Sequence, residues 1–511
     1  MAARARTVLA IVVLAAAGGV LYTRHLAEVP PHLMHDESQF VLQAESIAST
    51  GRDLAGRFMP VFFTEPEFPA GRDPAIVYAT AAVLKVRPFS ESSGRLATAL
   101  VGVLNIVLMF LLVRALFNST PLALAAAAMI AFTPAHFIRS RLALSPMYSV
   151  PFILLWLWTL VEHERRPTAV RIAVAGAWLG LGLYTYLAGV IMMPLYLGAS
   201  VCLVGRRHGM SHAGAMLASF TVVLVPMLVW YGTHPERFDQ IFGSYREFST
   251  APAATSVAGI RARAALYWSF FDPAFLFVSG DSSLVNSTRR AGFFPAAFFV
   301  LLPVGLYWIA KSGRPILWII GAGFVLSPLA AVISGAVEMN RLMFAIPFGV
   351  LVACVGATMM LGGRRWEQVV ALLLLATIPL QFAHFYDDYS NRYRAQAGAW
   401  FGGNIGDALV PVIASRPLNA AGGVYISERI PFARRYWRFY ALQSGRRDQI
   451  DTPEYSLEPP NAAPAGSRWI CASAAPDCQA LEASTEWRRV YSSGEPGQAG
   501  VFDVFVRLPA S

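Results

Sequence analysis

Residues 94–116 read GRLATALVGVLNIVLMFLLVRAL, and this stretch decides the fold. Its only charged residues are Arg95 and Arg114, one near each end. A helix needs about 20 predominantly apolar residues to cross the hydrocarbon core of a bilayer. The stretch is long enough to do so, which predicts a protein that lies in a membrane.

The composition of the whole chain agrees with this prediction. Of the 511 residues, 56% are hydrophobic and 14% are charged, and the mean hydropathy is +0.49. Soluble domains carry about 25% charged residues. The net charge of +10 is explained by basic loops beside the membrane, so we expect membrane lipids and no nucleic acid as partners.

Apolar runs recur along the first 385 residues. They lie at residues 7–24, 94–116, 119–138, 146–163, 170–187, 188–204, 212–232, 293–310, 315–335, 342–362 and 366–384. With the N-terminus inside, every inside connection carries arginine or lysine, as the positive-inside rule requires. We therefore predict a polytopic α-helical membrane protein with about 11 transmembrane helices, its N-terminus cytoplasmic and its C-terminus outside. The alternative for the first run is a cleaved signal peptide.

The predicted membrane module covers residues 1–385 and has two long outer loops, 25–93 and 233–292. Residues 386–511 have the composition and length of one small soluble domain. We predict a small C-terminal α/β domain here, because residues 423–426 and 501–505 are strand-like and residues 430–443 are helix-like. In an oxidising compartment Cys471 and Cys478 would pair as a disulfide, and the alternative is two unpaired thiols.

Two adjacent acids, Asp36 and Glu37, follow His35 just after the first apolar run. An ionised acid beside apolar surface needs a partner or a function, and a carboxylate here suits a general base for an acceptor hydroxyl. The alternative is a helix N-terminus, with Asp36 as its cap and Glu37 favouring the helix dipole. The two interpretations are compatible.

Arginines in the short predicted outer loops, near residues 136–145 and after the ninth run, go against the positive-inside trend. They are Arg139, Arg141 and Arg341. The planar guanidinium group suits a phosphate oxyanion. The alternatives are snorkelling to lipid headgroups and, for Arg341, an ion pair with Glu338.

The second outer loop contains an aromatic stretch at residues 271–281, which predicts either an interface belt or a groove for an isoprenoid chain. For Asp281, together with Arg289 and Arg290, we expect one of two roles. These side chains either bind a sugar or simply keep the loop in contact with water. The sequence has no Walker loop, and its cysteines lack metal-ligand spacing.

Taken in order, these residues resemble a known family. The chain resembles the bacterial membrane glycosyltransferases of the GT-C fold, namely the protein-mannosyltransferase-like family and its aminoarabinose-transferase relatives, over roughly residues 20–345. The matching features are Pro31 before Asp36-Glu37, the Gly-Asp-x-x-Gly-like residues 51–56, Pro60, Arg95, Ser140-Arg141, Tyr184-Thr185-Tyr186, Asp272-Pro273 and Gly280-Asp281. Relatives often carry an Arg-His pair where this chain has Val285-Asn286, so Arg289 or Arg290 would substitute, or the donor differs.

The resemblance implies an inverting glycosyltransferase of the bacterial inner membrane. It would move a sugar from a polyprenyl-phosphate carrier to a hydroxyl of a lipid, glycan or protein acceptor on the periplasmic side. Asp36 would be the base and Glu37 would assist. Arg141 and Arg341, and less so Arg139, would bind the donor phosphate.

The resemblance also makes His35, Asp281, Arg289 and Arg95 candidate substrate-binding residues. No cofactor is required, because arginines can supply the positive charge, and a divalent cation near Asp36 stays open as an alternative. The rival function is a transporter or flippase of lipid-linked sugar. The sequence shows no internal repeat of the kind that transporters often have.

Overall fold

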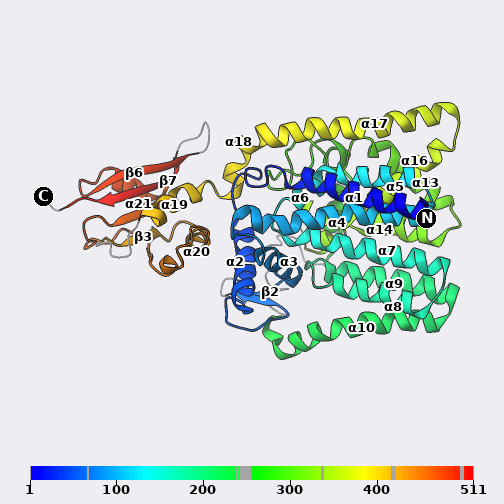
Figure 1. The fold of residues 1–511 in the computed structure, drawn as a ribbon, viewed down its shortest axis with the longest axis horizontal. Coiled ribbons are helices and arrows are strands. Elements are labelled where there is room, and N and C mark those ends of the chain that lie inside the picture. Colours follow the sequence, from blue (N-terminus) through cyan, green and yellow to red (C-terminus); the bar gives the residue numbers. More distant parts are fainter. Residues whose placement is uncertain are drawn as a thin grey trace.

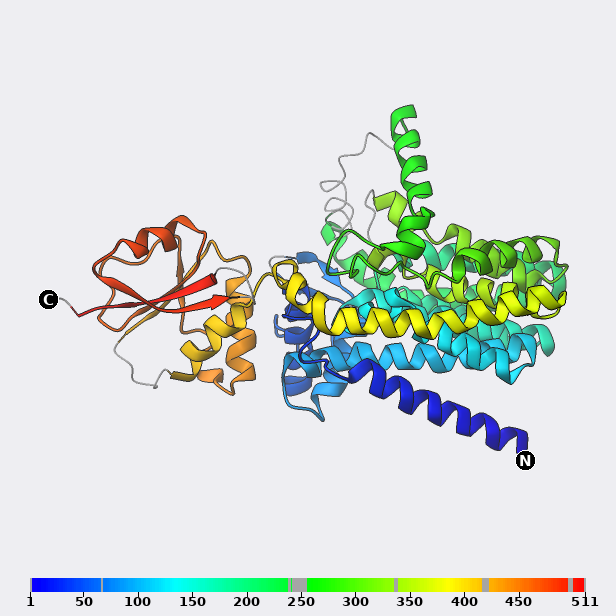
Figure 2. The same ribbon diagram turned by 90° about the horizontal axis from the view of Figure 1, so that it is seen from above.

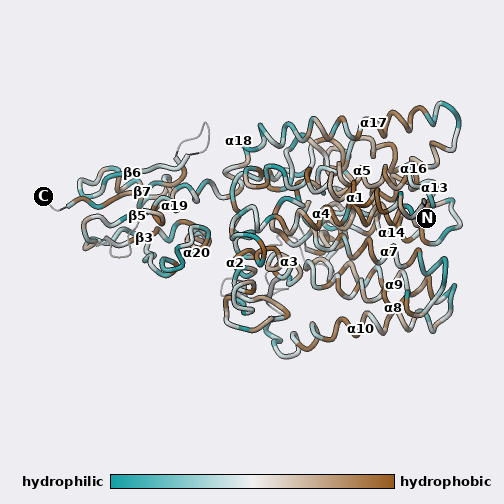
Figure 3. The backbone as a smooth tube through the Cα atoms, in the orientation of Figure 1, coloured by the Kyte–Doolittle hydropathy of each residue, from teal (hydrophilic) through white to brown (hydrophobic). Residues whose placement is uncertain are grey.

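The computed structural model describes residues 2–65, 68–237, 240, 255–334, 339–415, 422–494 and 500–509. A bundle of helices makes up most of the molecule, and a smaller domain with a β-sheet lies at one end of it (Figure 1). The hydrophobic residues gather along the bundle helices, as Figure 3 shows.

Each predicted apolar run coincides with a helix, or with two helices separated by a break. The helices are α1 (Ala2–Thr23), α4 (Glu91–Phe117), α5 (Thr120–Ala131), α6 (Pro134–Ser140), α7 (Ser149–Arg165), α8 (Ala169–Gly182), α9 (Gly189–His208), α10 (Met210–Thr233), α13 (Phe298–Lys311), α14 (Pro315–Leu326), α15 (Leu329–Ser334), α16 (Ala345–Leu361) and α17 (Arg365–Asp388). Helix α1 lies along the outside of the bundle (Figure 2).

The number of helices long enough to span a membrane is smaller than predicted. Among the described residues, six pass by length and composition, or seven if the bent pair α5 and α6 counts as one span. The other runs lie on α7, α8, α13 and α16, which have only 14 to 17 residues. A helix of 14 residues is about 21 Å long, short of the ~30 Å hydrocarbon core. The runs predicted the apolar segments correctly but not where their helices end.

The first outer loop folds at the end of the bundle that faces the C-terminal domain (Figure 1). It contains α2 (His35–Thr50), the hairpin strands β1 (Phe63–Glu65) and β2 (Phe68–Arg72), and α3 (Pro74–Leu84). The second outer loop contributes α12 (Val257–Ser269) and a π-helix at Ala274–Val278. Both loops therefore have ordered elements of their own.

After α17 the chain continues through short helices into the C-terminal domain. The short helices are Tyr389–Tyr393, α18 (Arg394–Ala397) and Gly398–Phe401. The domain contains α19 (Ile405–Ser415), β3 (Val424–Ser427), α20 (Ala433–Gln443), the 3-10 turn Arg447–Gln449, β4 (Glu454–Ser456), β5 (Arg468–Ala472), α21 (Pro476–Glu482), β6 (Trp487–Gly494) and β7 (Gly500–Arg507).

The described strands of this domain form one sheet in the order β4-β3-β5-β7-β6. Strand β3 runs parallel to β4 and β5, whereas β7 is antiparallel to β5 and β6. All four residues of β3 are buried, as expected for a central parallel strand. The predicted α/β character of the domain is confirmed. Cys471 and Cys478 form the predicted disulfide, which joins β5 to α21.

The C-terminal domain packs directly on the first outer loop. One apolar cluster contains Leu33, Val41 and Leu42 from around α2 together with residues of α19 and α20. The ring of Phe89 lies 4.8 Å from that of Phe439 on α20. Because this apolar contact is continuous, α2 is held between the bundle and the C-terminal domain.

Candidate active site

The first turn of α2 carries the predicted catalytic acids. Pro30 and Pro31 precede it, and the carboxylate of Glu37 accepts a hydrogen bond from the amide of Met34 at 3.1 Å, which caps the helix. Met34 is the N-cap residue, so the alternative interpretation of Asp36 as the cap is wrong. Both acids lie in the first turn, where negative charge stabilises the helix dipole.

Glu37 forms a fully buried ion pair with Arg95 of α4. Arg95 donates from Nε and Nη2 to the two Glu37 oxygens, each at 2.9 Å. Neither side chain is exposed. Oε1 of Glu37 also accepts from the amide of Ala143 at 2.8 Å. Arg95 further donates to the carbonyls of Pro30 and His32, at 2.8 and 2.6 Å. The pair therefore joins α2, α4 and two loops, and both side chains are occupied by protein groups.

Asp36 differs from its neighbour in exposure. Its side chain is 34% exposed, and the nearest His35 nitrogen lies 3.8 Å away. Burial raises the pKa of the facing Tyr436 hydroxyl on α20, and the charges of Glu37 and Asp36 add to this effect. Of the two acids, Asp36 is the one that a substrate can reach.

His35 turns toward the C-terminal domain. Its imidazole stacks on the ring of Phe432, with 4.5 Å between the centroids and 3° between the planes. Its carbonyl accepts a hydrogen bond from Arg435 at 3.3 Å. The C-terminal domain therefore holds the same helical turn that carries Asp36.

Arg141 lies directly after α6 and is buried. Its Nη atoms donate to the carbonyls of Tyr22 and Val29, at 2.8 and 2.7 Å. Its guanidinium also lies over the rings of Phe137 and Tyr389. Its Nε has no acceptor among the described residues. In this structure Arg141 anchors the end of α1 and the loop that follows it.

Asn286 links Arg139 to Asp281, and Asp281 in turn contacts the turn that carries Arg341. Arg139 donates to Oδ1 of Asn286 at 2.8 Å, and Nδ2 of Asn286 donates to Asp281 at 3.0 Å. The same Asp281 oxygen accepts from the amide of Met339 at 2.8 Å. Met339 opens the turn Met339–Leu342, which contains the half-buried Arg341. Glu338, the alternative ion-pair partner, lies outside the described residues.

Arg289 and Arg290, the arginines of the second outer loop that the sequence singled out, lie on the surface. Arg289 donates to the carbonyl of Ser282 at 2.6 Å and lies over Trp400. Arg290 lies 3.8 Å from Asp388 at the end of α17. Both contact other outer segments rather than Arg139 or Asp281.

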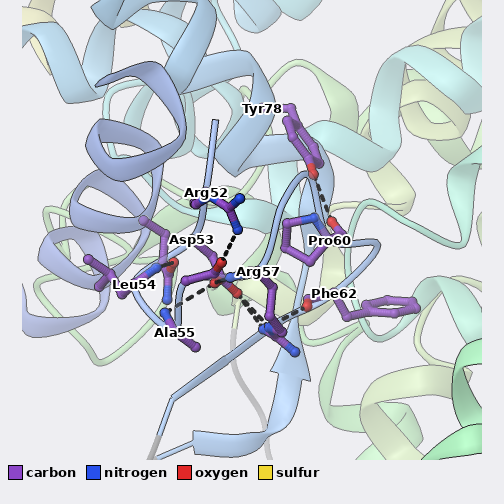
Figure 4. A network of polar contacts seen from close by, with 10 residues as sticks. Arg52, Asp53, Leu54, Ala55, Arg57, Pro60, Phe62 and Tyr78 are labelled. Atoms are coloured by element: carbon purple, nitrogen blue, oxygen red, sulfur yellow. Dashed lines mark hydrogen bonds and ion pairs between the residues drawn. The ribbon is translucent and has the colours of Figure 1, made fainter. Parts of the chain in front are cut away.

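The Gly-Asp-x-x-Gly-like stretch forms a tight turn, which Figure 4 shows. The buried Asp53 carboxylate accepts from the amides of Ala55 and Arg57, at 3.1 and 2.7 Å, and from Nε of Arg57 at 2.8 Å. The amide of Leu54 donates to Gln43 of α2 at 3.1 Å. This motif therefore builds the loop and supports α2.

The comparisons with known proteins agree with the fold described above. Residues 69–230 match the family model described as dolichyl-phosphate-mannose-protein mannosyltransferase. The crystal structure of ArnT from Cupriavidus metallidurans bound to undecaprenyl phosphate superposes with a TM-score of 0.61 at 15% identity, over 98% of each chain. The chain has the GT-C fold.

The apo form of ArnT gives a TM-score of 0.62 at 14% identity, over 99% of this chain and 98% of ArnT. The archaeal oligosaccharyltransferase AglB from Archaeoglobus fulgidus gives 0.51 at 14% identity, over 88% of this chain and 64% of AglB. No curated protein sequence matches the chain. The predicted resemblance to the GT-C membrane glycosyltransferases is confirmed by the matched family model and by the fold.

Sequence reasoning missed several residues of this GT-C site. Asn286 had been noted only as a departure from the family pattern, yet it links Arg139 to Asp281. Tyr389 and Tyr393 follow the last apolar run, and their rings stack with centroids 4.9 Å apart. Tyr393 donates to the carbonyl of Leu284 at 2.6 Å. The only signal for these tyrosines was their aromatic character beside the membrane boundary.

The described part of the chain contains no evident ligand set for a resident metal ion. Among the described residues, no group of three or more His, Cys, Asp or Glu side chains has suitable geometry. Among the described residues, the arginines in contact with the first turn of α2 are Arg95, which pairs with Glu37, and Arg435, which donates to the His35 carbonyl.

Proposed function

We propose that this protein transfers a sugar from a polyprenyl-phosphate donor to an acceptor hydroxyl, with inversion, on the outer face of a bacterial inner membrane. Two comparisons support the donor class. The matched family is described by its dolichyl-phosphate-mannose donor, and the similar ArnT structure contains undecaprenyl phosphate. The acceptor would be a lipid, a glycan or a protein.

One observation carries the proposed role of Asp36. Glu37 is fully buried in its pair with Arg95, whereas the side chain of the neighbouring Asp36 is 34% exposed on the same helical turn. A general base must reach the proton that it removes. In this proposal Asp36 is the base, and Glu37 and Arg95 are positioning residues.

The proposed reaction forms one bond to the anomeric carbon, breaks another and moves one proton to the protein. The acceptor oxygen attacks the anomeric carbon from the side opposite the phosphate, and its proton passes to Asp36. The bond between the anomeric carbon and the phosphate oxygen breaks, and the polyprenyl phosphate leaves as an anion. A fixed positive charge near that oxygen lowers the barrier, often by several kcal/mol.

In our proposal Arg141 and Arg341 supply this charge, and Arg139 assists. The Nη atoms of Arg141 already donate hydrogen bonds to two backbone carbonyls. A donor phosphate would therefore accept a hydrogen bond from Nε, or would take the place of one of these carbonyls as acceptor. Asp281 and Asn286 hold Arg139 near the turn that contains Arg341. The mechanism requires no metal ion.

The direct test supplies purified protein in lipid nanodiscs with polyprenyl-phosphate sugars labelled in the sugar. Membrane extract provides the acceptor. We expect label to move from the donor to a lipid, glycan or protein fraction, and the carrier to be released as the monophosphate. If sealed vesicles instead accumulate intact labelled donor across the membrane without transfer, the chain is a flippase and the proposal fails.

A further inference from the structure

A second charged site lies at the opposite end of the bundle from α2, where the N-terminus lies (Figure 1). A cavity of about 200 Å³ opens there among the ends of α4, α7 and α9 and the connection from α13 to α14. Arg165, Arg207 and Arg314 line it, with Glu164 as the one acid. The proposed sugar transfer does not use this site.

The charges around this cavity are not balanced. Arg207 pairs with Glu164 at 2.9 Å, and His208 lies 3.2 Å from the same carboxylate. Arg165 pairs at 3.2 Å with Glu162 one turn away. Among the described residues, Arg314 has no ion-pair partner. The lining side chains therefore carry three positive charges and one negative charge.

Helix capping explains only part of this arrangement. Arg165 donates to the carbonyl of Ala115, and Arg314 donates to that of Leu116 at 3.3 Å, as expected for cations at the C-terminus of α4. Each guanidinium has five N–H groups, so most of these donors remain available. The side chains of Arg165 and Arg207 are 45% and 44% exposed. Arg207 is not used in capping α4.

The size and lining of the cavity narrow the choice of ligand. Arginine forks bind phosphate in two-point contacts. A cavity of about 200 Å³ is smaller than the roughly 300 Å³ that encloses a whole small-molecule ligand. Val161, Pro315 and Ile316 add apolar wall beside the arginines. These features fit the phosphate head group of an amphiphile whose chains stay in the surrounding lipid.

We propose that this cavity binds the phosphate head group of an anionic membrane lipid, such as phosphatidylglycerol. The face is the one that the positive-inside pattern predicts to be cytoplasmic. Basic pockets between transmembrane helices on that side are suited to anionic lipid head groups. A bound head group would join four helix ends through Arg165, Arg207 and Arg314.

The test measures lipid binding by the delipidated full chain in detergent. Native mass spectrometry counts bound phosphatidylglycerol and phosphatidylcholine, and thermal unfolding gives the midpoint shift with each lipid. We expect preferential binding of phosphatidylglycerol and a higher midpoint with it. The double variant Arg207→Gln/Arg314→Gln should bind at least threefold less. Arg206→Gln, which removes the neighbouring arginine outside the cavity, is the matched control and should bind as wild type.

A phosphate control and a single variant complete the test. Inorganic phosphate at equal concentration should not raise the midpoint, because it lacks the apolar part, and an equal shift would overturn the lipid assignment. If the double variant does not fold, Arg207→Gln alone serves, because among the described residues the Arg207 guanidinium forms its ion pair with Glu164 and does not cap α4. Equal binding of both lipids, or undiminished binding by the folded variant, would overturn the proposal.

Discussion

The imidazole of His35 stacks face to face on the ring of Phe432, with 4.5 Å between their centroids. His35 opens the helix that carries Asp36, and Phe432 precedes α20 of the C-terminal domain. The stack joins two segments that lie almost 400 residues apart in the chain. The C-terminal domain thus reaches the proposed catalytic turn directly.

Removing this stack should slow the proposed reaction. A small displacement of a catalytic group reduces rate strongly, so we expect Phe432→Ala to lower kcat about tenfold with little change in donor KM. Phe432→Tyr keeps the stacked ring and should restore the rate. Steady-state kinetics in nanodiscs measures both. A Phe432→Ala enzyme with wild-type kcat would show that the stack does not position α2.

Replacing the proposed base should abolish transfer without unfolding the protein. General-base catalysis contributes about 10²- to 10⁴-fold, so Asp36→Asn should lose at least a hundredfold in kcat. Because the side chain is partly exposed, the unfolding midpoint should hardly change. Glu28→Gln neutralises another exposed acid of the same loop and is the matched control. Turnover by purified Asp36→Asn comparable to this control would remove Asp36 from the mechanism.

Breaking the buried ion pair should affect stability first. Arg95→Ala leaves the fully buried Glu37 carboxylate without its partner, at a cost of about 3–5 kcal/mol. Adding Glu37→Gln to Arg95→Ala removes the uncompensated charge and should recover part of the loss. Denaturant unfolding in detergent compares the single and double variants. If Arg95→Ala alone is as stable as wild type, the pair does not hold the loops together.

Interrupting the polar link between Arg139 and Asp281 should weaken donor use. Asn286→Leu keeps the size of the side chain but removes both hydrogen bonds, so Arg139 loses its orientation. We expect a roughly tenfold lower kcat/KM for the donor, equivalent to about 1.4 kcal/mol. Ser282→Ala alters an exposed position of the same loop and is the control. If Asn286→Leu has unchanged donor kinetics, the contacts of Asn286 stabilise the loop but do not contribute to donor use.

Reducing the disulfide should destabilise the C-terminal domain. Cys471 and Cys478 close a loop of seven residues, and a loop of this length is worth about 2–3 kcal/mol in the chain-entropy model. Dithiothreitol should therefore lower the unfolding midpoint of that domain. The Cys471→Ser/Cys478→Ser variant should have the lower unfolding midpoint from the start, and dithiothreitol should not change it. Equal midpoints with and without reduction in the wild type would contradict this expectation.

Much of the fold was predictable because it depends on local pattern. Each apolar run became helical because a buried backbone in lipid must satisfy its own hydrogen bonds, whatever its neighbours are. The apolar segments of the tail similarly predicted strands such as β3 and β7. The helix lengths were not predictable, because breaks such as the one between α5 and α6 fall inside a single apolar run.

The sequence by itself determined which segments form apolar helices, that a small α/β domain follows them, and that an Asp-Glu pair comes just after the first of them. Only the tertiary structure separated the two acids, because burial depends on groups distant in the chain. Glu37 is fully buried against Arg95 and the amide of Ala143, whereas the side chain of Asp36 stays 34% exposed. Likewise, Asn286 acquired its role only when α6, the second outer loop and the Met339–Leu342 turn met in space.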